Sequence, residues 1–351
     1  MYTSFEVENF RCFKKLILPS LARINLIAGV NNVGKTALLE ALFLHAGASN
    51  PELSLKLNAF RGIEKMKVAV GKWEDYPWFS LFRQFDISKP IELASHKEAN
   101  AFQSVHLRAI TAPAELKALS KKIEYEITPS GMLELQYQDE KGIKGPFYLI
   151  LDQRGIRFEP AAPSFSLSTF FLSSRKRPTF EEEAELFGDL EKKGKQELIS
   201  QTLKILEPRL RRLSMIYTPG QPILHGDIGL EEPLPLPFMG EGMVRLANIA
   251  IRVGNAAGGI VLLDEIENGL HHTVLREVWK AIAEAARQFN TQVFATTHSR
   301  ECIAAAHQAF VESGTYDFRL HRLDRINHEI RAVTYDQESL QASLEMNLEV
   351  R

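Results

Sequence analysis

The chain has 351 residues, 45% hydrophobic and 25% charged, enough to bury a substantial core as one large domain or two ordinary ones. Its net charge of -2 gives no overall basic field, so contact with nucleic acid would need a local patch. Its two cysteines, Cys12 and Cys302, lack metal-ligand spacing, which argues against a disulfide or zinc framework and for a reducing compartment. The N-terminus has no apolar run of signal length, and no segment approaches the roughly 20 apolar residues of a membrane span. We therefore expect a cytoplasmic protein that does not contact a membrane.

The first 46 residues predict a strand, a glycine loop and a helix. The alternation in "SFEVENF" favours a strand, and "RINLIAG" is a continuous apolar run typical of a buried strand. From Thr36 to about His45 the apolar positions indicate a helix that is buried on most sides.

The middle of the chain predicts an antiparallel sheet followed by charged helices. Residues 50–102 show no clear pattern, whereas 104–110, 121–140 and 145–160 favour hairpin-connected strands, with turns at 129–131 and 152–155. After residue 163 the composition turns to charged helix, with Thr179 as N-cap and acidic residues in the first turn. Ile199, Leu203 and Leu206 recur at helical spacing, but heptads are not sustained.

The last third returns to strands and helices. Apolar strands at 259–265 and 291–299 flank a helix of about 15 residues, which is the spacing of a strand–helix–strand unit. The tail from Asp336 carries Leu340, Leu344 and Leu348 four apart and predicts one packed terminal helix.

The loop after the second strand has the full spacing of a Walker A motif, Gly-x-x-x-x-Gly-Lys-Thr. Glycines let the backbone turn its N–H groups toward phosphate oxygens, the lysine reaches the β and γ phosphates, and the threonine hydroxyl binds magnesium. A glycine turn with an accidental lysine is the alternative, which the position between strand and helix disfavours. The predicted nucleotide-binding residues are Gly29, Asn31, Asn32, Val33, Gly34, Lys35, Thr36 and Ala37.

An acidic pair ends the strand at 259–265 and resembles a Walker B motif. Carboxylates at the end of such a strand can face phosphates bound at a neighbouring strand. We expect Asp264 to hold magnesium together with Thr36, and Glu265 to orient or deprotonate the attacking water. The alternative is an acidic pair that only caps the next helix.

His298 ends the strand at 291–299. A neutral imidazole there could hydrogen-bond the γ phosphate, whereas a lone strand-end histidine more often has a structural role. Its position after the acidic strand favours the catalytic interpretation, beside Lys35 and Glu265.

These motifs, together with "VENFRCFKKLIL", "DEIENGLHH" and "TTHS", resemble the ABC-type head ATPases of the SMC and RecF kind. The resemblance is greatest to the compact AAA-labelled bacterial ATP-binding proteins related to the ATPase half of OLD-family nucleases. It implies an α/β fold, an ABC-ATPase head with a P-loop core, an antiparallel β lobe and a helical insertion. The implied division of the single head, 1–351, is a P-loop and β lobe (1–160), a helical insertion (161–222) and a lobe with the signature loop, Walker B motif and histidine switch (223–351).

The resemblance also implies that "FMGEGMVRLANIA" is the signature loop, with Gly240, Glu241 and Gly242 closing on ATP held by a second copy. Asn268, Gly269 and His271 would lie in the loop that crosses between the two sites. The sequence departs from the family pattern, because Gly240 replaces serine, Glu241 replaces glycine and Met243 replaces glutamine. The loss of a hydroxyl contact to the γ phosphate makes slow turnover plausible.

Two features of the family have no clear counterpart in this sequence. The glutamine that bridges magnesium and the antiparallel lobe could be Gln84, Gln103, Gln136 or Gln138. Arg11 matches a position near the nucleotide in relatives, although an early lone arginine is usually a surface residue.

Other patterns are given structural interpretations. His271 and His272 are adjacent, so they point in different directions and favour helix-entry polarity over a metal pair. The basic clusters at 173–178 and 207–212 could contact nucleic acid, but without aromatic neighbours we interpret them as solvated helix surface.

We expect an ATP-hydrolysing switch in which two copies clamp two Mg-ATP molecules and pass the motion to DNA or to a partner effector. The alternative is a nucleotide-gated scaffold or sensor with negligible hydrolysis, for instance in phage defence. An OLD-type nuclease is disfavoured because only 53 residues follow His298 (351 minus 298), too few for its metal-binding domain. A coiled-coil tether lacks heptads, and small-molecule kinase chemistry fits the acidic pair less well than hydrolysis does.

Overall fold

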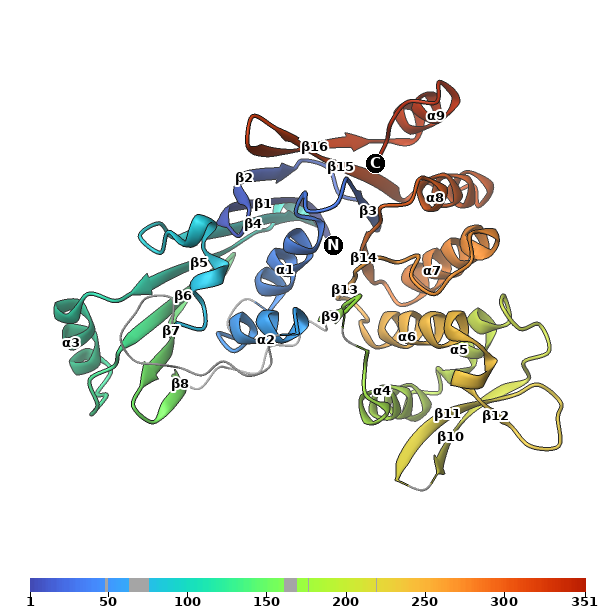
Figure 1. The fold of residues 1–351 in the computed structure, drawn as a ribbon, viewed down its shortest axis with the longest axis horizontal. Helices are drawn as coiled ribbons and strands as arrows, with labels where there is room; N and C mark the ends of the chain where they lie inside the picture. The colour runs from blue at the N-terminus through green and yellow to red at the C-terminus, as the bar shows by residue number, and fades with distance from the viewer. Residues whose placement is uncertain (48–49, 63–75, 161–168, 176, 219) are drawn as a thin grey trace.

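The computed structural model describes residues 1–47, 50–62, 76–160, 169–175, 177–218 and 220–351. These form two large sheets with a helix between them, and further helices on the far side of the six-stranded sheet (Figure 1). The architecture is the α/β fold expected from the sequence. Among the described residues, no helix combines the length and the apolar character needed to cross a bilayer.

The central sheet has six strands in the order β16-β15-β3-β14-β13-β9. All neighbours are parallel except the β15–β16 pair, which is an antiparallel hairpin. The strands are β3 (Ile24–Ala28), β9 (Thr169–Leu172), β13 (Ile260–Leu263), β14 (Gln292–Thr296), β15 (Phe318–Ile326) and β16 (Glu329–Tyr335). β3, β13 and β14 are buried along their whole length, as their continuous apolar runs predict.

The second sheet is antiparallel, with seven strands in the order β2-β1-β4-β5-β6-β7-β8. Its strands are β1 (Tyr2–Phe10), β2 (Phe13–Leu18), β4 (Ile91–Lys97), β5 (Phe102–Ile110), β6 (Gly131–Asp139), β7 (Gly142–Asp152) and β8 (Gly155–Glu159). The predicted antiparallel strands near 104–110, 131–140 and 145–160 are confirmed. β2 was not predicted, and β4 lies in the stretch without a clear pattern.

The strand predicted at 121–128 is wrong. The chain instead forms α3 (Pro113–Lys122), followed by irregular backbone up to β6. Pro113 at the helix start and lysines in the last turn favour a helix. α3 packs Leu116 against Ile110 and Met132 on the outer face of the sheet. The alternating apolar and polar residues at 121–128 therefore belong to the end of α3 and to the loop that follows it.

Helix α1 (Lys35–Ala46) lies between the two sheets, and its apolar side chains join residues of both in one core (Figure 1). Every described α1 residue except Thr36 is buried, which confirms the prediction of a helix buried on most sides. α2 (Leu53–Phe60) packs beside it.

Helices α6 (Glu241–Asn255), α7 (Leu275–Gln288) and α8 (Arg300–Glu312) cover the other face of the central sheet and form a second core there (Figure 1). The 14 residues of α7 agree with the predicted helix of about 15. Because both faces of the central sheet are covered, the only parts of its parallel strands left for binding are their ends.

The region between β9 and α6 contains more strand than expected. Its helices are α4 (Phe180–Lys192) and α5 (Gln196–Leu203), and a small sheet follows with β10 (Arg212–Thr218), β11 (Gln221–Asp227) and β12 (Leu234–Pro235). Thr179 caps α4 through a capping box with Glu182, as predicted. The interpretation of the two basic clusters as helix surface is wrong, because the described residues 173–175 and 177–178 lie outside any helix and 207–212 leads from α5 into β10.

The tail forms α9 (Gln337–Glu345), capped by Asp336. Leu340 is buried on it and Leu344 packs against the second core. Leu348 lies beyond the helix end and is exposed, so the helix is shorter than the leucine spacing predicted.

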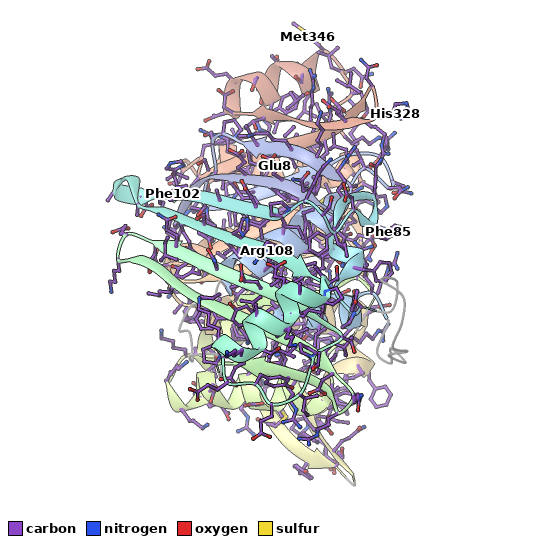
Figure 2. The ribbon with its side chains drawn as sticks, turned by 90° about the vertical axis from the view of Figure 1, so that its left-hand side faces the viewer. Glu8, Phe85, Phe102, Arg108, His328 and Met346 are labelled. Atoms are coloured by element: carbon purple, nitrogen blue, oxygen red, sulfur yellow. The ribbon has the colours of Figure 1, made fainter. Side chains whose placement is uncertain are left out.

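The outer face of the seven-stranded sheet is strongly charged, as the view onto that face in Figure 2 shows around Glu8 and Arg108. Lys15 forms ion pairs with Glu6 and Glu8 across β1 and β2. Arg108 forms ion pairs with Glu115 of α3 and Glu134 of β6. Because the inner face of this sheet is covered and its outer face carries paired charges, apolar and polar residues alternate along its strands.

Candidate functional site

Four parallel strands bring their carboxyl ends to one edge of the central sheet. Leu172 of β9 is paired with Leu263 of β13, which is paired with Ala295 of β14. Thr296 of β14 is in turn paired with Ile27 of β3. Because parallel strands end in register, the residues that follow each of them meet at this edge.

The loop after β3 requires glycine at two positions. Gly29 has φ 149°, and a Cβ atom there would lie 2.6 Å from Val33 Cγ1. Gly34 has φ 106°, and a Cβ atom would lie 2.7 Å from Cys12 Sγ. Any side chain would therefore be strained and would displace the loop or the β1–β2 turn that packs against it. The loop runs directly into α1, so its N–H groups add to the positive end of that helix.

Lys35 begins α1 and folds back over the loop. Its Nζ donates to the carbonyl oxygens of Gly29 at 2.6 Å and Val30 at 3.1 Å. Burial lowers the pKa of Lys35 below its usual value, while the nearby carboxylates of Glu265, Asp264 and Glu267 act in the opposite direction. The ammonium group is thus a buried cation at the place where the Walker A motif binds phosphate.

Asp264 follows β13 and is fixed by three hydroxyl groups. Thr36 donates to its Oδ1 at 3.0 Å and Thr296 to the same oxygen at 2.8 Å. Ser174, which follows β9, donates to Oδ2 at 2.9 Å. These donors are all oxygen atoms, which Mg²⁺ prefers, so the cluster fits a magnesium ion bound beside the phosphates. Among the described residues no group of three or more His, Cys, Asp or Glu side chains forms a separate metal site.

Glu265 lies next to this cluster with an unusual backbone. Its φ is 48°, a conformation rare outside glycine and asparagine. Its N–H donates to Thr296 Oγ1 at 2.8 Å, and its Oε2 accepts from Asn268 Nδ2 at 2.8 Å. The buried Arg245 of α6 donates to the carbonyl oxygens of Asp264 and Glu265. Both acidic residues are therefore held at backbone and side chain, which preorganises them for charge-dependent chemistry.

His298 follows β14, with its side chain half-exposed. Its Nδ1 lies 3.3 Å from Glu267 Oε1. The same oxygen accepts from the His298 N–H at 3.0 Å and from Thr297 Oγ1 at 2.8 Å. Glu267 thus orients the imidazole and its backbone together.

The predicted signature loop opens α6. A 3₁₀ turn at Leu236–Met239 precedes Gly240, which has φ 108° and would have nothing within 4 Å of an added Cβ. No side chain caps the helix start. A Cβ on Gly242 would lie 3.1 Å from the carbonyl oxygen of Gly269, so the signature loop packs against the predicted dimer loop of the same chain.

His271 accepts a hydrogen bond from the Thr273 N–H at the turn before α7. The histidine pair therefore has a structural role at the start of the helical segment, as the sequence favours.

The structure brings together the residues predicted at 29–36, 264–265 and 298, because they all follow strands of one parallel sheet. Ser174, Glu267 and Arg245 belong to the same cluster but were not predicted. The spacing of Glu267, two residues after Glu265, was a usable signal for it. Ser174 had no such signal, because only the pairing of β9 with β13 brings it to Asp264.

Arg11 and the four glutamines contact other groups. The Arg11 side chain is 8% exposed, so it is not a surface residue; it forms a 3.0 Å ion pair with Glu40 and donates to Ser80. Its contact with nucleotide stays a prediction.

Among the described residues, none of the four candidate glutamines forms a hydrogen bond with Asp264. Gln84 accepts from Arg83, Gln103 donates to His45 and Gln136 donates to Glu134. Gln138 pairs with Ser104 and Ile143 within the antiparallel sheet. Ser174 is the residue that joins the magnesium-type cluster from the neighbouring strand.

Two family models match the chain. The model described as "AAA ATPase domain" matches residues 1–207, and the model described as "AAA domain, putative AbiEii toxin, Type IV TA system" matches residues 120–304.

Among curated proteins, the chain is similar to one called ATP/GTP phosphatase from Helicobacter pylori, at 24% identity over 97% of each chain. It is also similar to the uncharacterized protein MJECL10 of Methanocaldococcus jannaschii, at 44% identity over 14% of this chain and 22% of that protein.

Among solved structures, similarity extends over almost the whole chain to SMC heads. One is the SMC head bound to the C-winged helix domain of ScpA, with a TM-score of 0.53, 13% identity and coverage of 97% of this chain and 99% of the other. Another is an SMC head with an extended coiled coil bound to the C-terminal domain of ScpA derived from Pyrococcus furiosus, with a TM-score of 0.50, 11% identity and 99% coverage of both. At these identities the likeness shows the fold. Since each family model spans more than half of the chain, the protein belongs to the AAA ATPase family, and its fold is that of the ABC-type heads of SMC proteins.

Proposed function

We propose that this ATPase is a molecular switch in which ATP joins two copies of the chain and hydrolysis releases them. The observation that carries the proposal is the convergence of Lys35, Thr36, Asp264 and Glu265 at one sheet edge, while the signature loop of the same chain opens outward. Within the described residues no hydrogen bond or ion pair joins Gly240–Gly242 to the loop at Gly29–Thr36. A second copy would complete each site, giving two composite sites about a two-fold axis.

The residues of one copy supply binding and positioning. Lys35 would leave its loop carbonyls for the β and γ phosphates, and the free N–H groups of the Walker A loop would surround the β phosphate. Thr36 and Asp264, steadied by Ser174 and Thr296, would hold magnesium. When bound, the ion neutralises charge that develops on the phosphates.

Glu265 and His298 stand beside the place of the γ phosphate. The carboxylate of Glu265 would orient the attacking water and accept its proton. His298, fixed by Glu267, would donate a hydrogen bond to the γ phosphate. Most of the rate would come from positioning and charge stabilisation, as in other phosphoryl transfers.

The test uses two variants and light scattering. Lys35→Ala should abolish ATP binding. Glu265→Gln should bind ATP without hydrolysing it and should accumulate as a dimer. The double variant Lys35→Ala, Glu265→Gln is the control and should stay monomeric with ATP. ATP binding that survives Lys35→Ala, or a Glu265→Gln protein that stays monomeric with saturating ATP, would contradict the proposal.

What the switch drives is a partner effector or DNA in this proposal. Two SMC heads of similar fold are bound to a domain of ScpA, which supports a protein partner. A DNA partner would raise the steady-state ATPase rate, and salt would weaken that effect steeply. A rate unchanged by duplex DNA at low salt would favour a protein effector.

The altered signature loop favours a second candidate, a nucleotide-gated sensor with negligible hydrolysis, for instance in phage defence. The family model that names an AbiEii toxin is compatible with such a role. Purified protein that hydrolyses ATP at an ordinary steady rate without a partner would exclude this candidate.

A further inference from the structure

We propose that Arg177 is a catalytic residue that acts on the nucleotide held by the other copy, in place of the hydroxyl missing from the signature loop. This inference rests on the proposed ATP-dependent dimer and assigns a further residue to its composite site. Gly240 stands where the resembling ATPases have serine, so the loop itself offers only N–H groups to a γ phosphate. A guanidinium group at the rim of the loop would supply the missing donor.

The side chain of Arg177 lies at that rim. Its Nη2 is 2.7 Å from Glu241 Oε1, and Glu241 is the first residue of α6, directly after Gly240. The Arg177 and Glu241 side chains are 85% and 66% exposed. The chain thus holds an exposed cation beside the start of the signature loop, where it can reach a phosphate group of a second copy.

The negative charge of Glu241 explains why the signature loop needs an arginine beside it. A carboxylate at the start of α6 would repel the phosphates of a second copy if it stood alone. Arg177 offsets this charge, and its planar fork can bind one carboxylate and one phosphate oxygen at the same time. Glu241 in place of the signature glycine is therefore compatible with phosphate binding in a composite site, because its carboxylate binds the arginine and its charge is neutralised.

Glu241 also contacts the dimer loop. A Cβ on Gly269 would lie 2.9 Å from Glu241 Cγ, and the preceding residue, Asn268, donates to Glu265 at 2.8 Å. The carboxylate that holds Arg177 therefore lies against the loop that binds Glu265, which supports a role for the arginine in catalysis more than a chance surface pair.

The reaction step is hydrolysis of the γ phosphate. The water oxygen forms a bond to the γ phosphorus as the bond to the bridging oxygen breaks, and that electron pair goes to the β phosphate of the leaving ADP. The water proton passes to Glu265 and then to solvent or phosphate. Arg177 of the second copy takes no proton; it neutralises the charge on the γ oxygens in the transition state.

The first experiment compares variants of the pair in the full-length protein. Arg177→Ala should lower kcat by about 100-fold, the size of the loss of one transition-state donor, and Arg177→Lys should keep part of the rate. Glu241→Gln removes the carboxylate that holds the arginine and should lose part of the rate. The matched control is Arg209→Ala, because it removes another exposed arginine that is paired with a carboxylate, Glu207, and it should keep the rate. An Arg177→Ala protein as active as that control would overturn the proposal.

The second experiment mixes inactive variants to decide which copy uses the arginine. A dimer of Lys35→Ala with Arg177→Ala contains one composite site with an intact Walker A loop and an intact arginine from the mate. An equal mixture should therefore hydrolyse ATP well above the sum of the two variants measured separately, because each mixed dimer has one intact site. Lys35→Ala with Glu265→Gln should recover nothing, because both residues belong to the same copy's half of the site.

Lys35→Ala mixed with Gly240→Asp is the reference for action in trans. If that mixture recovers and the Arg177→Ala mixture does not, Arg177 acts within its own chain and the proposal fails. If neither mixture recovers, disulfide cross-linking decides. In the Glu265→Gln background with ATP, Arg177→Cys of one copy should form a disulfide with Val30→Cys of the other. Absence of the cross-linked dimer would overturn the proposal. The ATP-dependent dimer of Glu265→Gln alone reports separately on the proposed function.

Discussion

The hydroxyl of Thr36 donates to the carboxylate of Asp264 across 3.0 Å, although 228 positions separate them in the chain. Thr36 belongs to the Walker A loop and Asp264 to the end of the acidic strand. Their contact joins the two halves of the candidate site, and it fixes where a magnesium ion would bind. Ser174 reaches the same carboxylate from a third strand, so the site draws on distant parts of the sequence.

Ser174→Ala should weaken magnesium-dependent ATP hydrolysis. The change removes one of three hydrogen bonds to Asp264, and loss of a residue that orients a metal ligand costs about 10- to 100-fold in metal affinity or activity. The measurement is the ATPase rate as a function of magnesium concentration at fixed ATP.

Ser173→Ala is the matched control for that variant, because the Ser173 hydroxyl donates instead to the Phe60 carbonyl oxygen. The control should retain the wild-type magnesium dependence. The same magnesium dependence in both variants would show that Ser174 does not support the metal site.

Glu267→Gln should lower kcat about tenfold and leave ATP affinity unchanged. A hydrogen bond to a charged group contributes about 1.5–3 kcal/mol, and the loss of about 1.4 kcal/mol in the transition state gives a tenfold slower step. The carboxylate of Glu267 orients His298 by contacts with its ring and its N–H. Single-turnover kinetics with excess enzyme measure the effect, and Glu301→Gln, at the start of α8, is the exposed acidic control. A Glu267→Gln protein with the wild-type single-turnover rate would remove Glu267 from the positioning role.

ATP affinity should fall as the pH rises toward 10.5, the usual pKa of lysine. Burial lowers the pKa of Lys35 in the nucleotide-free protein, and phosphate contact would raise it again. The ammonium contribution to binding is therefore complete below the pKa of the free protein. It is lost as the pH rises through that value, with a limit of about tenfold per pH unit.

Calorimetric titration with a non-hydrolysable ATP analogue measures this dependence, with circular dichroism at each pH to confirm folding. Lys35→Arg is the control, because arginine stays charged over the whole range and should give a flat profile. A wild-type affinity as flat as that of the arginine variant would contradict the assignment of the lowered pKa to Lys35.

Glu40→Ala should reduce the free energy of unfolding by about 3–5 kcal/mol, because it leaves the buried guanidinium of Arg11 without its charged partner. Glu40 is fully buried in α1, and Arg61 also binds it through two hydrogen bonds of 2.6 and 2.8 Å. Urea unfolding followed by tryptophan fluorescence measures the difference. Glu52→Ala, which removes an exposed pair with Lys56, should change stability by about 0.5 kcal/mol or less. A Glu40→Ala protein as stable as that control would show that the buried triad does not stabilise the P-loop helix.

Part of the site could be predicted because its signals are local. Gly29 and Gly34 are needed for backbone angles and close contacts inside one short loop, and Lys35 and Thr36 follow at fixed spacing, so the motif can be read from eight consecutive residues. The apolar runs before Asp264 and His298 likewise identify buried strands whose ends carry polar residues.

The wrong strand at 121–128 shows the limit of such local patterns. A short alternation of apolar and polar residues near a helix end is consistent with a strand or a helix when burial is unknown. Packing of Leu116 against the outer face of the sheet favours the helix α3. The shortened tail helix, which ends before Leu348, has the same cause.

The sequence by itself determined the phosphate loop, the acidic strand end and the strand–helix–strand unit that links Asp264 to His298, since each depends on neighbours along the chain. Only the tertiary structure decided that Ser174 supports Asp264, that Glu267 orients His298 and that Arg177 stands beside the signature loop. These contacts arise from the parallel register of β9, β13 and β14 and from the packing of α6, and register between distant strands leaves no mark on the residues that it brings together.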